Sequence, residues 1–256
     1  MPFDLWTWYH GLYIASPLVL AYALFRLTSR ADYAEKRRLG LWLSSAAMVV
    51  LVVRNVTILL TEGFHAQVVP LQVCHFANIV LWLAFYLRSD KLFALSFCLN
   101  LPAAFISLVF ANALAAYPSF WMLLAQTYFW GHLLIVMIAL WAVLAGMVTI
   151  DRRVFGQTVM LMAGLFVGAM VLNNVLKLIP TLSEANYFYT VRPEEGTPLE
   201  WFYTLGVSGE LGFFEYNVLY WTLTAMLGVV VVVLFYGLYV WLTRHVDVTA
   251  REARRA

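Results

Sequence analysis

One cysteine and one histidine stand out as residues able to carry out nucleophilic chemistry in an otherwise apolar chain. Cys74 lies in the polar stretch 70–78, and His132 lies in a later apolar segment. An unpaired polar group in hydrocarbon costs several kcal/mol, so such residues need a partner or a function. A histidine can remove the proton of a thiol while the sulfur attacks an ester carbonyl. The residue types are therefore suited to nucleophilic chemistry, and we take Cys74 as the candidate nucleophile and His132 as its candidate base.

Each of these residues also has a structural interpretation. A lone cysteine in an apolar helix often packs as a small core residue, and His132 is able to form a hydrogen bond between helices. Arg54 is able to extend its charged end to the headgroups. For each residue considered alone, the structural interpretation is favoured over a functional one. Because the polar residues fall at one depth of the membrane, together they favour a site.

The composition is that of an integral membrane protein. Hydrophobic residues make up 63% of the chain and charged residues 12%, whereas about a quarter of a soluble domain is charged. The formal net charge of +2 gives no reason to expect a nucleic acid partner. Cys74 and Cys98 form neither a disulfide framework nor a metal-binding motif. We therefore expect no cofactor and no metal.

Seven apolar segments approach or exceed the length of about 20 residues that a spanning helix needs. They cover residues 5–27, 41–60, 70–87, 92–116, 120–150, 154–179 and 217–243. The fourth is interrupted by Asn100, Pro102 and Asn112. The sequence therefore predicts an all-α, polytopic bundle of about seven helices that forms one domain over residues 1–256.

Lysine and arginine gather in alternate loops, which predicts the orientation. With seven crossings all the basic loops fall on one side, so we expect the N-terminus outside and the C-terminus in the cytoplasm. The long acidic loop around residues 183–215 then lies outside, and its length predicts a function or a folded cap.

A rise of about 1.5 Å per helical residue places almost all polar side chains of the segments in the outer half of the membrane. The candidates for stabilising an oxyanion are Gln72, His75, Asn78, Asn173, Asn186 and Tyr187. Arg54 and Lys177 are candidates for holding a lipid phosphate. Asn174 and His10 complete the set of polar residues at this depth. Cys74 and Asn78 are four residues apart and share a helix face.

Four motifs resemble those of a known family. They are Val69-Pro70-Leu71-Gln72-Val73-Cys74; His132 in Tyr128-Phe129-Trp130-Gly131-His132; Asn173 or Asn174 followed by Ala185-Asn186-Tyr187-Phe188-Tyr189 and Arg192-Pro193; and the early His10. In this order they resemble the YwaF family of bacterial multi-pass membrane proteins. Its superfamily includes a human ether-phospholipid acyltransferase and the androgen-induced hydrolases of fatty acid esters.

The resemblance implies a catalytic dyad of Cys74 and His132 in a bacterial plasma membrane. In the acyltransferase branch a cysteine takes an acyl chain from a phospholipid and passes it to a lysophospholipid. In the hydrolase branch a threonine takes the nucleophile position. Because this chain has a cysteine there, Cys74, it resembles the acyltransferase branch.

Three other functions stay open at this point. A lipid-ester hydrolase would use the same pair of residues and admit water to the thioester. A transporter or lipid-binding protein would use Cys74 and His132 only for packing. Binding of haem or quinone through His10, His75 and His132 is a further alternative. The sequence leaves open the acyl chain, the headgroup, the acceptor and the oligomeric state.

Overall fold

The computed structural model describes residues 3–111, 114, 117–194 and 197–253. Its long helices are α1 (Trp8–Leu27), α2 (Tyr33–Glu62), α3 (Val73–Leu87), α4 (Asp90–Leu95), α5 (Leu101–Val109), α7 (Leu123–Leu144), α8 (Arg152–Leu176) and α10 (Val218–Ala253), with α4 and α5 joined by the π-turn η1 (Ser96–Asn100). Among the described residues, six helical stretches are long and apolar enough to span a membrane, and α3 is a shorter apolar helix. The predicted all-α polytopic membrane protein is confirmed.

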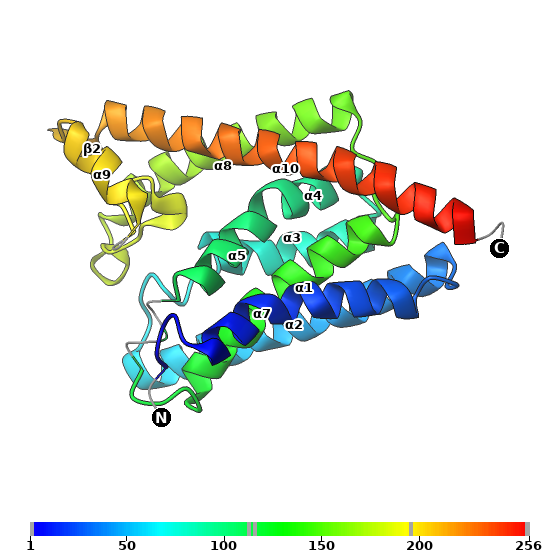
Figure 1. Ribbon diagram of the computed structural model, residues 1–256. Helices are drawn as coiled ribbons and strands as arrows, with labels where there is room; N and C mark the ends of the chain where they lie inside the picture. The colour runs from blue at the N-terminus through cyan, green and yellow to red at the C-terminus, as the bar shows by residue number, and fades with distance from the viewer. Residues whose placement is uncertain (1–2, 112–113, 115–116, 195–196, 254–256) are drawn as a thin grey trace.

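The helices lie in layers (Figure 1). The α4–α5 stretch and α7 are central, with 61% of their spanning windows buried, whereas between 11% and 22% is buried in α1, α2, α8 and α10. On one side α1 and α2 pack against α7, and on the other α8 packs against α4 while α10 packs against η1. The central layer is therefore the place where polar side chains can be shielded from lipid.

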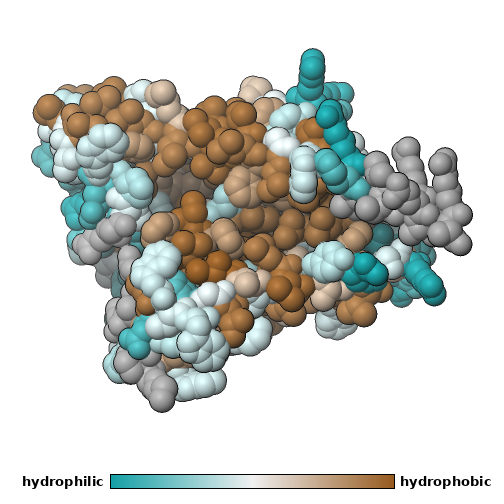
Figure 2. Space-filling view, in the orientation of Figure 1, coloured by the Kyte–Doolittle hydropathy of each residue, from teal (hydrophilic) through white to brown (hydrophobic). Residues whose placement is uncertain are grey.

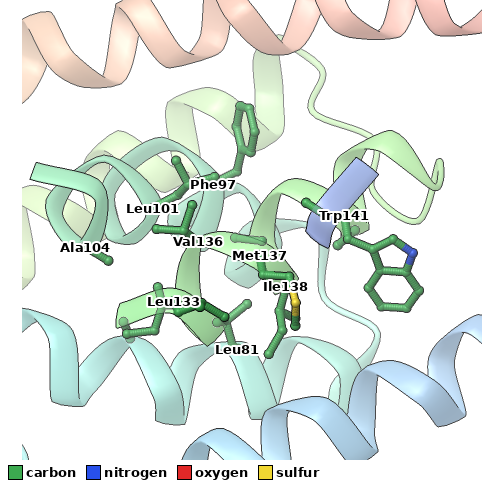
Figure 3. Packing of buried hydrophobic residues seen from close by; sticks show 14 of the residues in the cluster. Leu81, Phe97, Leu101, Ala104, Leu133, Val136, Met137, Ile138 and Trp141 are labelled. Atoms are coloured by element: carbon green, nitrogen blue, oxygen red, sulfur yellow. The ribbon is translucent and has the colours of Figure 1, made fainter. Parts of the chain in front are cut away.

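The core between the central helices is apolar and closely packed. Figure 3 shows Leu81 of α3, Leu101 of α5 and the α7 side chains Leu133, Val136 and Ile138 gathered between the central helices. Lipid chains are as apolar as these residues, so packing contacts and small residues drive helix association in a membrane. Gly40 is an example, because a Cβ there would overlap the ring of Phe85.

The outer surface matches a membrane environment. Figure 2 shows an apolar band across the middle of the molecule, with hydrophilic residues toward its ends. Exposed apolar side chains such as Met160 of α8 and Leu234 of α10 belong to this surface. Their exposure would be unfavourable in water, so we interpret these faces as contacts with lipid.

The connections divide into a basic end and a cap end. At the basic end, Arg37 of α2 donates to the last carbonyls of α3, and Lys36 donates to the Ala145 carbonyl after α7. At the other end lie the loop before α3, the loop before α7 and the cap, defined here as residues 177–217 (Figure 1). Which end faces outside stays a prediction from the loop charges.

The cap contains short elements of its own. These are the 3-10 turns η2 (Pro180–Leu182) and η3 (Tyr187–Tyr189), the helix α9 (Pro198–Leu205) and the antiparallel hairpin of β1 (Gly209–Leu211) with β2 (Phe214–Tyr216). In the hairpin, Glu210 lies opposite Glu215. The prediction that the acidic loop forms a folded cap agrees with this structure.

Several helix boundaries differ from the predicted ones. Helix α3 begins at Val73 rather than at residue 70, and α7 covers Leu123–Leu144 rather than residues 120–150. The predicted segment 92–116 is broken into α4, η1 and α5. Pro102 has no amide hydrogen and its ring crowds the carbonyl four residues earlier, so the backbone widens into a π-turn there. Asn112, predicted to interrupt the same segment, lies outside the described residues.

Candidate functional site

Cys74 lies in the first turn of α3, at the cap end. Its side chain is half-buried, and its Sγ atom lies 3.9 Å from the Oγ of Ser107 on α5. The Asn78 side chain donates to the Cys74 carbonyl oxygen at 3.0 Å. Asn78 therefore shares a face with Cys74, as predicted, but its side chain donates to the backbone rather than to the thiol.

The N-terminus of α3 favours negative charge near Cys74. Gln72 is the N-cap residue, and its side chain makes no capping hydrogen bond. The first amides of a helix lack helical acceptors, and the helix dipole adds a partial positive charge at this end. Both effects favour an anionic group, such as a developing oxyanion, next to the first turn of α3.

His132 lies on α7 with one ring nitrogen fixed. Its Nδ1 lies 2.7 Å from the Tyr128 carbonyl oxygen, one helical turn earlier. Because a carbonyl oxygen only accepts, Nδ1 carries the hydrogen, which leaves the lone pair on Nε2. The Nε2 atom of His132 is thus the ring nitrogen that is able to accept a proton.

Tyr128 connects the histidine to the surroundings of the cysteine. Its ring packs on His132, with the ring centroids 4.2 Å apart. Its hydroxyl donates to the Ser107 carbonyl oxygen at 2.8 Å, and the Ser107 hydroxyl is the group beside the Cys74 thiol. Within the described residues, Cys74 and His132 form no direct hydrogen bond, so Tyr128 and Ser107 are the link between them.

Arg54 and His75 bring two more polar groups to this place. The Arg54 Nη1 donates to the Asn55 side chain and to the Gln67 carbonyl, at 3.0 and 3.1 Å. Arg54 interacts electrostatically with Cys74, His75 and His132. His75 is 7% exposed, and its buried Nδ1 has no hydrogen-bond partner among the described residues.

The cap approaches Cys74 from the other side. Phe188 packs edge-on against Phe76 of α3, with ring centroids 6.0 Å apart. The Tyr189 side chain hydrogen bonds Glu194, and both residues interact electrostatically with Cys74. Burial, reinforced by Glu194, raises the pKa of the Tyr189 hydroxyl, so this hydroxyl stays protonated and donates to the carboxylate.

The cap holds a strained backbone over the site. Phe188 and Tyr189 have φ angles of 57° and 53°, in the left-handed region that bulky residues rarely adopt. The hydroxyl of Tyr220 donates to the Tyr189 carbonyl, and the Trp221 indole donates to the Thr190 carbonyl. Helix α10 therefore fixes the segment that faces Cys74.

Most other predicted site residues hold the cap together. The Asn173 side chain donates to the Tyr187 carbonyl and to Thr190 and accepts from the Tyr187 amide. The Asn174 side chain accepts from the Glu215 amide at 2.7 Å. Asn186 accepts from the amides of residues 191 and 192, and the Tyr187 hydroxyl donates to the Ala66 carbonyl.

The three remaining candidates differ in their surroundings: they are Lys177, His10 and Gln72. Lys177 forms an ion pair with Glu215 of the hairpin, so its charge is already matched. His10 is fully buried, accepts from the Trp6 amide and donates to the Leu108 carbonyl, which ties α1 to α5. Gln72 is half-buried next to Cys74, with no capping bond from its side chain.

In the described part of the chain, two cavities lie away from Cys74 and His132. One, of about 280 Å³, lies in the cap between the hairpin and the start of α10. The other, of about 500 Å³, lies at the basic end beside α8. The described residues hold no cluster of three metal-ligating side chains. That Cys74 and His132 act together on a substrate stays a prediction.

Four residues of this site were not among the sequence candidates: Ser107, Tyr128, Tyr189 and Glu194. Ser107 is a polar residue within an apolar segment, and Tyr128 precedes His132 by one helical turn. These two signals were available. Tyr189 and Glu194 approach Cys74 only because the cap folds back, which no local pattern indicates.

The fold and the buried polar residues at one end define a polytopic α-helical membrane protein with a polar site in its bundle. The chain belongs to the TMEM164 family, since residues 5–239 match the family across nearly the whole sequence. No curated protein and no solved structure matches the chain.

Proposed function

We propose that this protein is a membrane-embedded lipid acyltransferase in which Cys74 is the nucleophile and His132 the base. The supporting observation is the link through Tyr128, which orients His132 with its carbonyl and holds Ser107 beside the Cys74 thiol with its hydroxyl. The residues supply the groups of a cysteine–histidine pair: a nucleophile, a base with its tautomer fixed, and a group that orients the base.

The reaction has two steps. The Cys74 sulfur attacks the ester carbonyl carbon of a phospholipid, forming a carbon–sulfur bond while His132 takes the thiol proton. The ester carbon–oxygen bond breaks, and the proton passes to the leaving lysophospholipid oxygen. In the second step the hydroxyl oxygen of another lysophospholipid attacks the thioester carbon and forms a new ester bond, while its proton passes to His132. The carbon–sulfur bond breaks, and His132 returns the proton to the sulfur, which restores the thiol.

Negative charge develops on the carbonyl oxygen in both steps. The uncapped amides at the start of α3 are suited to stabilise it. Among the sequence candidates, Gln72 stands at this helix end, whereas Asn173, Asn186 and Tyr187 use their side chains within the cap. We therefore assign oxyanion stabilisation to the first turn of α3.

The place of the reaction follows from the loop charges. With the basic end in the cytoplasm, Cys74 and the cap lie in the outer half of the bilayer. The resemblance of the sequence motifs to the YwaF family supports a bacterial plasma membrane and an acyltransferase activity. The cap contact between Phe188 and Phe76 is suited to limit the access of water to a thioester.

A covalent adduct is the direct test. The purified protein is incubated with a phospholipid that carries a labelled acyl chain, and the labelled peptide is identified by mass spectrometry. We expect a hydroxylamine-sensitive adduct on Cys74 that is absent in Cys74→Ala. Cys98→Ala is the matched control, because Cys98 is fully buried in the π-turn.

The fate of the adduct separates the candidate functions. Transfer of the label to an added lysophospholipid supports the acyltransferase. Release of the label to water without an acceptor would instead identify a lipid-ester hydrolase. A folded protein that forms no adduct with several phospholipid classes would contradict both enzymes and favour a lipid-binding or transport protein.

A further inference from the structure

His75 is a buried histidine that the proposed acyl transfer leaves without a role. It follows Cys74 directly and lies in the first turn of α3. The residue is only 7% exposed, and its buried Nδ1 lacks a hydrogen-bond partner among the described residues. A buried polar atom without a partner is unfavourable, so this nitrogen points to a ligand.

Arg54 is a cation with unused hydrogen-bond donors next to His75. Its Nη1 is held by the Asn55 side chain and the Gln67 carbonyl. Across the described residues, no carboxylate lies within ion-pair distance of its guanidinium. Its Nε and Nη2 groups form no hydrogen bond in the same part of the chain, which leaves one edge of the guanidinium to bind an anion in two places.

The loop before α3 positions these two residues together. Arg54 and Asn55, both on α2, bind the carbonyls of Gln67 and Val68. This anchors the chain shortly before α3, so the first turn with Cys74 and His75 is held against the end of α2. Arg54 interacts electrostatically with both residues.

We propose that Arg54 and His75 form a binding site for the phosphate of a glycerophospholipid whose ester carbonyl reaches Cys74. The Arg54 edge and the buried nitrogen of His75 bind the phosphate oxygens, while Cys74 attacks an ester on the same glycerol. This inference rests on the proposed function and names its substrate class. His75 takes the part that the sequence suggested for Lys177, whose charge is matched by Glu215.

The nearby carboxylates leave this site cationic. Glu62 interacts with Arg54 at longer range, and its carboxylate lies 3.2 Å from the ring of His65. Glu194 faces Cys74 from the cap and hydrogen bonds Tyr189. Among the described residues neither carboxylate forms an ion pair with Arg54, so one edge of its guanidinium stays able to bind an anion.

Two acyl donors with the same labelled chain test the inference. One is a phosphatidylglycerol and the other is a diacylglycerol, which has the ester but no phosphate. In His75→Leu and in Arg54→Met, we expect labelling of Cys74 by the phospholipid to slow about tenfold or more, since each change removes a charge-assisted hydrogen bond. Labelling by the diacylglycerol should stay within about twofold of the wild-type rate, because the ester chemistry is intact.

The controls separate a lost phosphate site from a damaged protein. Lys177→Met removes another cation at the same end and should leave the preference for the phospholipid unchanged. A parallel fall with both donors, or unchanged labelling by the phospholipid, would overturn the inference. If the wild type forms no Cys74 adduct with either donor, the proposed function fails while the phosphate site is tested by binding alone.

Binding is measured by protection of Cys74 from a maleimide. A dialkyl ether phospholipid, which has a phosphate but no ester, should slow alkylation in the wild type and lose this effect in His75→Leu. A dialkylglycerol should give little protection in either protein. If the ether phospholipid still protected Cys74 in both His75→Leu and Arg54→Met, the proposed phosphate site would be contradicted. Inorganic phosphate should not compete; competition would identify a free-anion site instead of a lipid headgroup site.

Discussion

Two groups of buried polar side chains lie at the same end of the bundle, and they differ in how completely they are paired. Near the end of α8, where this helix meets the cap, every polar atom of the Asn173 side chain has a partner. On α3, His75 and Asn78 each keep a buried polar atom without a partner among the described residues. Both groups are costly to bury. Only the second group is left with capacity to bind something else.

This difference separates scaffold from site. A polar group that is fully paired within the protein stabilises one conformation and has no donor left for a substrate. A polar group that is buried and unpaired costs stability in the empty protein, which is typical of functional sites. The asparagines of the cap are therefore interpreted as scaffold, and the first turn of α3 as the site.

The largest expected effect is on the base. His132→Gln removes the Nε2 lone pair but keeps a polar side chain of similar length. We expect the rate of Cys74 labelling by a phospholipid to fall about 100-fold or more, as is typical for loss of a general base. The measurement is the rate of adduct formation by mass spectrometry.

The control for this prediction is His65→Gln, because His65 lies in the loop before α3 and pairs only with Glu62. Its labelling rate should equal that of the wild type. A His132→Gln protein that is labelled at the wild-type rate would assign His132 to helix packing, as its alternative interpretation holds.

The next effect tests the scaffold. Asn173→Leu removes three hydrogen bonds, leaves the buried Tyr187 amide unpaired, and leaves the Tyr187 carbonyl with only the longer bond of 3.4 Å from the Thr190 hydroxyl. We expect a loss of about 3 kcal/mol in the free energy of unfolding, since unpaired buried groups cost about 1–3 kcal/mol each. Denaturant unfolding in detergent measures it. Unchanged stability would show that the cap does not depend on this asparagine.

A smaller effect is expected for the link between the two parts of the dyad. Tyr128→Phe keeps the ring on His132 but loses the hydroxyl bond to the Ser107 carbonyl. We expect about a fivefold slower labelling of Cys74, since one neutral hydrogen bond contributes about 1 kcal/mol. Tyr13→Phe is the matched control, because the buried Tyr13 hydroxyl has no partner among the described residues. Equal rates in both variants would remove Tyr128 from the site.

Much of the fold follows from the sequence because hydropathy and length are local properties. A run of about 20 apolar residues spans the membrane wherever it occurs, and alternation of basic loops fixes which helix ends lie together. The helical rise also placed Cys74, His132 and Arg54 at one depth, and the electrostatic contacts of Arg54 agree with this.

The rest of the fold and of the site depends on contacts between residues far apart in the sequence, which counting residues along a helix does not predict. The π-turn at Ser96–Asn100 changes the helical phase, so the direction of Ser107 does not follow from the residues before it. Lys177 meets Glu215 only because the hairpin of β1 and β2 returns to the end of α8. For the same reason the sequence did not separate the paired asparagines of the cap from the unpaired residues of α3.

The smallest expected effect is the sharpest test of the comparison. Asn78→Leu is the same chemical change as Asn173→Leu. Among the described residues, however, the Oδ1 atom of Asn78 is unpaired and its amide group donates only to the Cys74 carbonyl. That carbonyl keeps its helical partner, so no buried group is left without a bond. We expect the free energy of unfolding to change by less than about 1 kcal/mol, because replacing an unpaired polar group by an apolar one of similar shape is close to neutral. A loss as large as that of Asn173→Leu would mean that Asn78 is scaffold, and the distinction between the two groups would then fail.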